Sequence, residues 1–91
     1  MRHWTQIFKA LANINRLKII RLLSDGQPRT VSDITREIGI SFKATSRHLI
    51  LLDRLNVLEG QGREGHVFYG MDESIPEATA RAVNLFIKSS R

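Results

Sequence analysis

The stretch from residue 30 to residue 56 constrains the fold most, because two amphipathic segments there are joined by a tight connection that contains Gly39. Thr30 and Ser41 stand where the segments begin, and their hydroxyls can accept hydrogen bonds from the free N–H groups of a helix start. Gly39 suits the left-handed backbone that often ends a helix. The first segment also has an inward apolar stripe, Ile34 and Ile38. The pattern predicts a helix-turn-helix.

The second segment, residues 41–55, places apolar and cationic side chains on opposite faces when it is plotted at about 100° per residue. The apolar face consists of Thr45, Leu49, Leu52 and Leu55. The opposite face consists of Lys43, Ser46, Arg47, Ile50 and Arg54, with Asp53 at its margin. Arg and Lys donate to guanine in the major groove, which admits a helix, so we interpret this face as a DNA reader. The alternative is an ordinary solvated face in a basic chain.

Composition limits the possibilities further. The chain has 91 residues, 42% of them hydrophobic, and a formal charge of +5. This size predicts one domain, residues 1–91, with a modest core, and the charge favours polyanionic partners. There is no cysteine for a disulfide or a thiolate ligand. The N-terminal residues lack the features of a secretory signal and no segment is long enough to span a membrane, so we expect a cytoplasmic protein.

A β-hairpin is expected directly after the reader, over residues 57–71. Asn56 is a plausible left-handed stop, and alternating residues flank a glycine-rich tip at residues 62–65. A hairpin in this position is the wing of a winged helix. Arg63 at the tip is then placed to enter a minor groove or to clamp a phosphate, although a single Arg is also ordinary turn chemistry. His66 is expected to be a strand residue at the base of the wing.

Helices are expected on both sides of this unit. Asn13 or Asn15 can cap a central helix, and Ser74 can cap a last helix over residues 75–90. The first and last helices carry more apolar residues than one small core needs, which predicts a homodimer interface. That interface is expected to contain Trp4, Ile7, Phe8, Leu11, Ala78, Ala82, Leu85 and Phe86. The alternative is that these helices merely close the core of their own chain.

From about Ile7 to Met71 the chain resembles the winged-helix repressors of the ArsR type. The most specific part is SRHL at residues 46–49, together with Arg16 and Leu17 in the preceding helix. The resemblance implies a mainly α winged helix-turn-helix fold of about five helices and a homodimeric transcriptional regulator, usually a repressor. It places base reading on Phe42, Lys43, Ser46 and Arg47. The complete expected DNA-binding set is Ser41, Phe42, Lys43, Ser46, Arg47, His48, Ile50, Arg54 and Arg63.

The departures from the family concern metal sensing. Residues 29–33 match the segment that holds a cysteine box in many relatives, yet they contain no cysteine. Residues 76–91 contain no Asp or His, so the metal site that others build on the last helix is also missing. His3, His48 and His66 lie on three separate predicted elements, which makes a zinc site from them improbable. We therefore expect no metal and no cofactor, and the sequence identifies no effector.

Two function classes remain after this reasoning. The first is a sequence-specific DNA-binding regulator whose dimer reads an inverted repeat, with half-site centres roughly 34 to 36 Å apart. The second is a winged-helix module that binds protein through Phe42 and Ile50, although Ile50 also suits a thymine methyl group. An enzyme has no support, because the sequence shows no phosphate-binding glycine loop, paired carboxylates or catalytic triad.

Overall fold

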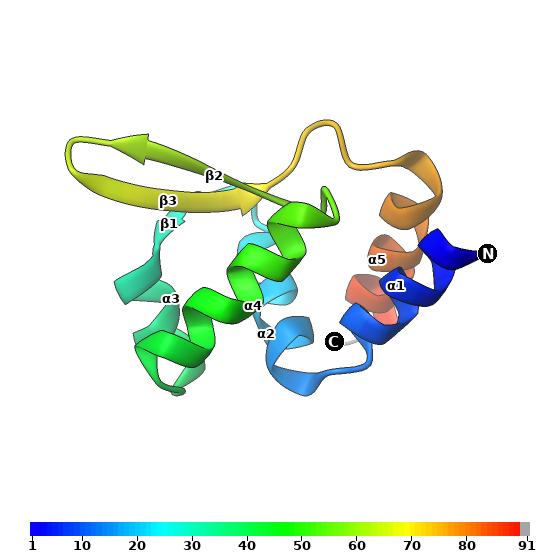
Figure 1. The fold of residues 1–91 in the computed structure, drawn as a ribbon, viewed down its shortest axis with the longest axis horizontal. Coiled ribbons are helices and arrows are strands. Elements are labelled where there is room, and N and C mark those ends of the chain that lie inside the picture. Colours follow the sequence, from blue (N-terminus) through cyan, green and yellow to red (C-terminus); the bar gives the residue numbers. More distant parts are fainter. Residues whose placement is uncertain (90–91) are drawn as a thin grey trace.

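The computed structural model describes residues 1–89. Its elements follow in the order α1 (Arg2–Leu11), α2 (Ile14–Leu23), β1 (Arg29–Thr30), α3 (Val31–Ile38), α4 (Phe42–Arg54), β2 (Leu58–Arg63), β3 (His66–Met71) and α5 (Glu77–Ser89). The terminal helices α1 and α5 lie at one end of the molecule, and the β2–β3 hairpin extends at the other end (Figure 1). The predicted winged helix-turn-helix with five helices is confirmed. Residue 90, the last of the expected final helix, lies outside the described residues.

Local hydrogen bonds form the helix-turn-helix as the sequence predicts. Thr30 Oγ1 accepts the N–H of Asp33 at 3.1 Å, and Ser41 Oγ accepts the N–H of Ala44 at 3.0 Å. Gly39 ends α3 with φ 81°, a left-handed conformation that costs glycine little. These caps place α3 and α4 at a defined angle, so α4 turns one face to the core and the other outward.

The hairpin is part of a three-stranded antiparallel sheet with the order β1-β3-β2. Its turn has two residues, Glu64 and Gly65, with φ values of 51° and 80°. Positive φ at both positions is typical of a type I′ turn, which matches the natural twist of paired strands. Strand β1, in which Arg29 pairs with Tyr69 and Thr30 with Phe68, was not predicted.

The core lies between α1, α2, α3, α4, the base of the hairpin and α5. Its buried members are Ile7, Ala10, Ile19, Ile20, Leu23, Ile34, Leu49, Leu52, Val57, Leu58 and Val83. Asn13 is the cap of α2, since its side chain accepts the N–H groups of Asn15 and Arg16. Asn56, just after the end of α4, has φ 59°, the left-handed conformation that the sequence predicts for it.

The entry into α5 differs from the prediction. Ser74 does not cap the helix, because its Oγ donates to the Asp72 carboxylate at 2.7 Å and its N–H donates to the same oxygen at 2.8 Å. The carbonyl of Pro76 instead accepts from the N–H of Ala80. A local turn around Asp72 therefore takes the hydroxyl that the capping prediction needed.

Candidate nucleic-acid interface

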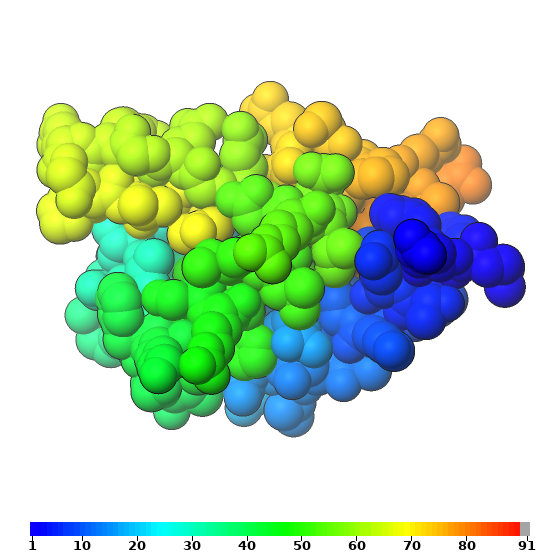
Figure 2. Space-filling view, in the orientation of Figure 1, coloured from blue at the N-terminus to red at the C-terminus, as the bar shows by residue number. Residues whose placement is uncertain are grey.

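The outward face of α4 is cationic and accessible. Lys43, Arg47 and Arg54 are exposed, and within residues 1–89 none of them takes part in an ion pair. Figure 2 shows the α4 residues, in green, at the front of the molecule beneath the yellow-green wing. Guanidinium and ammonium groups that are not neutralised by their own chain remain available to phosphates and base edges.

Apolar and small polar side chains lie among these charges. Phe42 and Ile50 are 56% and 46% exposed, Ser41 is exposed and Ser46 is half-buried. The face is therefore a mixture of charge, hydroxyl groups and apolar surface, a combination that suits phosphates, base edges and thymine methyl groups.

The inward face of α4 holds the helix in place. Thr45, Leu49 and Leu52 are fully buried, as the helical plot predicts, and Leu55 is half-buried. The hydroxyl of Thr45 donates to the carbonyl of Ser41 at 2.9 Å, so this buried polar atom is satisfied.

His48 faces the junction of α1 and α2. Its Nδ1 lies 3.2 Å from Nη1 of Arg16, and the same guanidinium donates through Nε to the Ala10 carbonyl at 2.6 Å and through Nη2 to the Lys9 carbonyl at 3.3 Å. Because arginine only donates, Nδ1 must accept, which places the proton of the neutral ring on Nε2. Burial, and then the charge of Arg16, lowers the pKa of His48. Arg16 thus links the end of α1 to α4.

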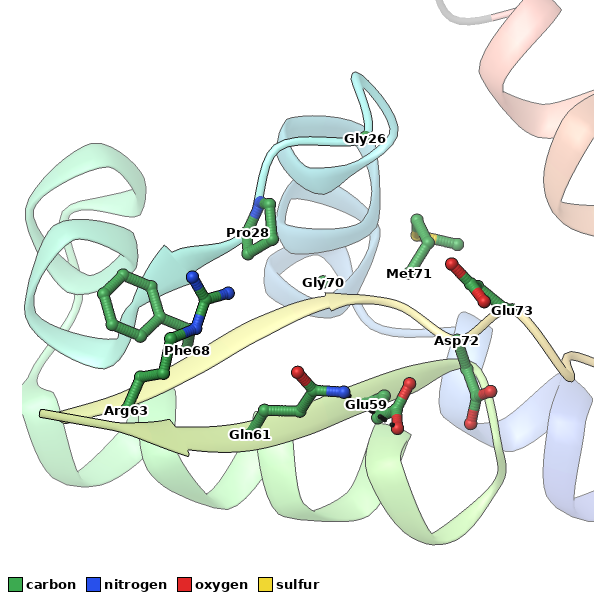
Figure 3. A pocket seen from close by; sticks show the side chains of 10 residues that line it. All are labelled: Gly26, Pro28, Glu59, Gln61, Arg63, Phe68, Gly70, Met71, Asp72 and Glu73. Atoms are coloured by element: carbon green, nitrogen blue, oxygen red, sulfur yellow. Dashed lines mark hydrogen bonds between the residues drawn. The ribbon is translucent and has the colours of Figure 1, made fainter.

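The side chain of Arg63 on the wing folds back onto the hairpin. The Arg63 guanidinium carbon lies 5.3 Å from the centre of the Phe68 ring, and Figure 3 shows the side chain bent back beside that ring. This is a cation–π contact. The prediction for His66 is wrong in one respect: it is an exposed strand residue, but it pairs with Arg63 at the tip of the wing and not at the base.

Arg63 also lines an open groove of about 470 Å³ between the wing and the loop before β1 (Figure 3). The groove is lined by Gly26, Pro28, Glu59, Gln61, Arg63, Phe68, Gly70, Met71, Asp72 and Glu73. Neither in this groove nor elsewhere in residues 1–89 is a group of three His, Asp or Glu side chains placed to hold a metal ion.

The terminal helices expose an apolar surface at the other end of the molecule. Phe8 is 60% exposed and stacks on Trp4, with ring centres 5.5 Å apart, and Leu85 is 69% exposed. Of the remaining expected interface residues, Ala78 is exposed, while Leu11, Ala82 and Phe86 are half-buried. The prediction for Ile7 is wrong, because Ile7 is fully buried in the core of its own chain and cannot contribute surface to a dimer.

Residues 13–62, which include α2, the helix-turn-helix and most of β2, match the family described as bacterial regulatory proteins of the arsR family. The chain belongs to the ArsR family. It is a transcriptional regulator with a DNA-binding winged helix-turn-helix, and members of this family are regulatory proteins rather than enzymes. A comparison with curated protein sequences gives no match.

Several solved structures have the same fold. A winged helix-turn-helix DNA-binding domain from Mycobacterium bovis, described as homodimeric and as a possible ArsR-family regulator, is 26% identical with a TM-score of 0.80; the match covers 98% of this chain and 79% of that one. HlyU from Vibrio cholerae is 24% identical with a TM-score of 0.81, covering 97% and 91% of the two chains. The transcriptional repressor BigR from Xylella fastidiosa is 22% identical with a TM-score of 0.80, covering 97% and 83%. None of the helices within residues 1–89 of this ArsR-family chain is long and apolar enough to cross a membrane.

Three contacts of this ArsR-family site were missed by sequence reasoning. Arg16 and His48 both belong to the most specific part of the family resemblance, SRHL at residues 46–49 together with Arg16 and Leu17. Their joint occurrence was the available signal for a contact between them. Phe68 and Tyr69 alternate between the two faces of β3, but nothing local in the sequence shows that the Arg63 side chain lies over the Phe68 ring. The side chain of Asp53 accepts the N–H of Gly60 at 3.2 Å, whereas the sequence placed it only at the margin of the cationic face.

Proposed function

We propose that this ArsR-family protein is a homodimeric repressor that binds an inverted-repeat operator without a metal. The observation that carries the proposal is the outward face of α4, where Lys43, Arg47 and Arg54 are exposed and no ion pair within residues 1–89 neutralises them. A rigid helix with such a face is the element that winged-helix proteins place in the major groove.

The expected DNA-binding residues are assigned to base edges or to phosphates according to their position in the structure. The N-terminal half of α4 enters the groove first, so Phe42, Lys43, Ser46 and Arg47 are assigned to base edges. Ile50 is assigned to a thymine methyl group. Phosphate contacts, which set register without reading sequence, are assigned to Ser41, His48, Arg54 and Arg63.

Dimerisation is supported by the exposed apolar surface around Phe8 and Leu85 and by the homodimer described for the Mycobacterium bovis domain. A twofold dimer would place one α4 in each of two successive major grooves. The operator is then an inverted repeat with half-site centres roughly 34 to 36 Å apart.

Repression is the mode named for BigR, which shares the fold. A regulator that occupies operator DNA blocks access to the sites it covers, and a bacterial regulator of this kind works in the cytoplasm beside the chromosome. No effector is assigned.

The decisive experiment is selection of duplexes from a random pool by the purified protein, followed by sequencing. We expect an inverted-repeat consensus, and we expect the Lys43→Ala/Arg47→Ala double variant to enrich no consensus. Arg36→Ala, a change at an exposed residue of α3, serves as the matched control and should recover the wild-type sequence. An unenriched pool with wild-type protein would contradict the proposal.

The second candidate is a protein-binding module, favoured by the exposure of Phe42 and Ile50. A gel shift with excess competitor DNA separates the two functions. A shifted band that persists for one duplex in the presence of competitor supports a sequence-specific DNA-binding regulator. Loss of every shifted band supports a protein-binding module.

A further inference from the structure

The wing and α4 meet at a crowded point around Gly60. Asp53, in the last turn of α4, is half-buried, and its Oδ2 accepts the N–H of Gly60 in β2 at 3.2 Å. Tyr69 lies across the same glycine, since a Cβ at position 60 would be only 2.8 and 2.9 Å from two carbons of its ring. The same Cβ would lie 3.3 Å from Asp53 Oδ2. No side chain fits at position 60 unless the ring or the carboxylate moves.

We propose that Asp53, Gly60 and Tyr69 form a lock that sets the angle of the wing against the reader helix, and that Asp53 and Tyr69 are positioning residues for the DNA contact of the wing. The inference rests on the proposed function, because it concerns how two DNA-contacting elements are held in register. The lock itself is a property of the free protein and can be measured without DNA.

An anchor at Gly60 matters because the hairpin beyond its buried base is exposed from residue 61 to residue 67. Strand β1 pairs with only two residues of β3, Tyr69 and Phe68, and β2 forms the free edge of the sheet. The wing tip at Arg63 lies three residues beyond Gly60, about 10 Å at the usual rise of a strand. A tilt of about 15° at Gly60 would therefore move the tip by roughly 2.6 Å, enough to break a hydrogen bond to a phosphate.

The charge of Asp53 fits the same role. A free carboxylate at the margin of a cationic DNA-binding face would repel phosphate. Here the carboxylate accepts a backbone N–H and lies close to the Tyr69 ring. Burial, and then the negative charge of Asp53, raises the pKa of Tyr69, so the phenol remains protonated beside the carboxylate at neutral pH. The acidic side chain thus contributes to wing placement, at the cost of a small local reduction in positive potential.

The first test compares Gly60→Ala with Gly62→Ala. Both residues lie in β2 with side-chain positions on the same face, but a Cβ at position 62 would meet only the His66 carbonyl, at 4.0 Å. We expect Gly60→Ala to lose hydroxyl-radical protection at the DNA flank covered by the wing. The magnitude of the slope of log K for DNA binding against log salt should decrease by about 1, because one phosphate contact is lost. The base preference of α4 should stay unchanged. Gly62→Ala should match wild type in all three measurements.

The second test reads the lock in the free protein by amide hydrogen exchange. Asp53→Asn keeps a carbonyl oxygen that can accept from Gly60, whereas Asp53→Ala removes the acceptor. We expect faster exchange of the Gly60 N–H in Asp53→Ala and near wild-type exchange in Asp53→Asn. The Gly60→Ala/Tyr69→Ala double variant, which removes the obstructing ring, should regain part of the wing-flank protection that Gly60→Ala alone loses.

These outcomes separate the lock from the proposed function. Equal Gly60 exchange in wild type and Asp53→Ala overturns the lock, whatever the DNA results. Unchanged wing-flank protection in Gly60→Ala, or a changed base preference in that variant, overturns the positioning role even if the lock exists. Failure of wild type to bind any duplex specifically overturns the proposed function, and the positioning role falls with it. Circular dichroism and thermal unfolding of each variant establish that it is folded.

Discussion

Removal of the Arg16 side chain should destabilise the protein more than removal of the side chain of Arg21, the other arginine of α2. The guanidinium donates hydrogen bonds to the Ala10 and Lys9 carbonyls and to His48. Hydrogen bonds that involve a charged group contribute about 1.5 to 3 kcal/mol when buried, and water replaces part of that here because the site is only partly buried. For Arg16→Ala we therefore expect a loss of about 1.5 to 3 kcal/mol in the free energy of unfolding.

The assay is thermal and urea unfolding at one fixed protein concentration, because dimerisation makes the midpoint concentration-dependent. The expected loss corresponds to a fall of about 6 to 24 °C in Tm for a domain of this size. Arg21→Ala is the matched control: Arg21 is exposed on the same helix, and its side chain has no hydrogen-bond partner within residues 1–89, so the change should stay within about 0.5 kcal/mol of wild type. Equal effects of the two substitutions would refute the bridging role of Arg16.

The same contact predicts a pH dependence. Burial and Arg16 lower the pKa of His48 below its ordinary 6.5. As the pH falls, His48 is therefore protonated at a higher pH in the unfolded chain than in the folded protein. The free energy of unfolding should then decrease from about pH 6.5 downward until the pH has passed the folded-state pKa of His48. His48→Asn, whose amide oxygen can replace Nδ1 as an acceptor, should abolish this dependence, and His66→Asn at the exposed wing tip should retain it. A slope that survives in His48→Asn would assign the titration to another group.

Three further predictions concern the reader, the wing and the dimer surface. Leu49→Ala, at a fully buried core position, should cost about 2 to 5 kcal/mol in urea unfolding, and a cost below 1 kcal/mol would contradict its packing role. Arg47→Ala should cost about 1 to 3 kcal/mol in operator binding and relax one base position in a selection experiment, whereas Arg63→Ala should weaken all duplexes alike; equal losses on every duplex from both variants would refute these roles. Phe8→Glu should leave the chain folded but monomeric in analytical ultracentrifugation, with Gln6→Glu on the same helix remaining dimeric as the control, and a Phe8→Glu dimer would place the interface elsewhere.

Features that depend on a few neighbouring residues were predictable from the sequence. The caps at Thr30 and Ser41, the left-handed Gly39 and the stop at Asn56 each satisfy backbone groups within a few positions, so their signals are local. The separation of faces on α4 is equally local, because it follows from helical periodicity alone. The resemblance to the ArsR family then predicted how these local elements combine into a winged helix.

Features that depend on distant partners were not predictable. Ile7 and Phe8 are both apolar neighbours on α1, and only the packed structure shows that one enters the core of its own chain while the other remains exposed. Strand β1 has two residues and exists through its pairing with β3, which no short window can reveal. Ser74 carried a valid capping signal, but a neighbouring carboxylate competed for it.

The contact between Arg63 and Phe68 has a consequence for the thermodynamics of docking. A long side chain that becomes immobilised on binding loses about 0.5 to 1.5 kcal/mol of rotamer entropy. Here the ring already restricts the guanidinium before any duplex arrives, so part of that entropic loss belongs to folding rather than to association. If Arg63 binds a phosphate as proposed, it must give up its contact with Phe68. The binding enthalpy, measurable by calorimetry, should then be smaller than for an arginine that starts free in water.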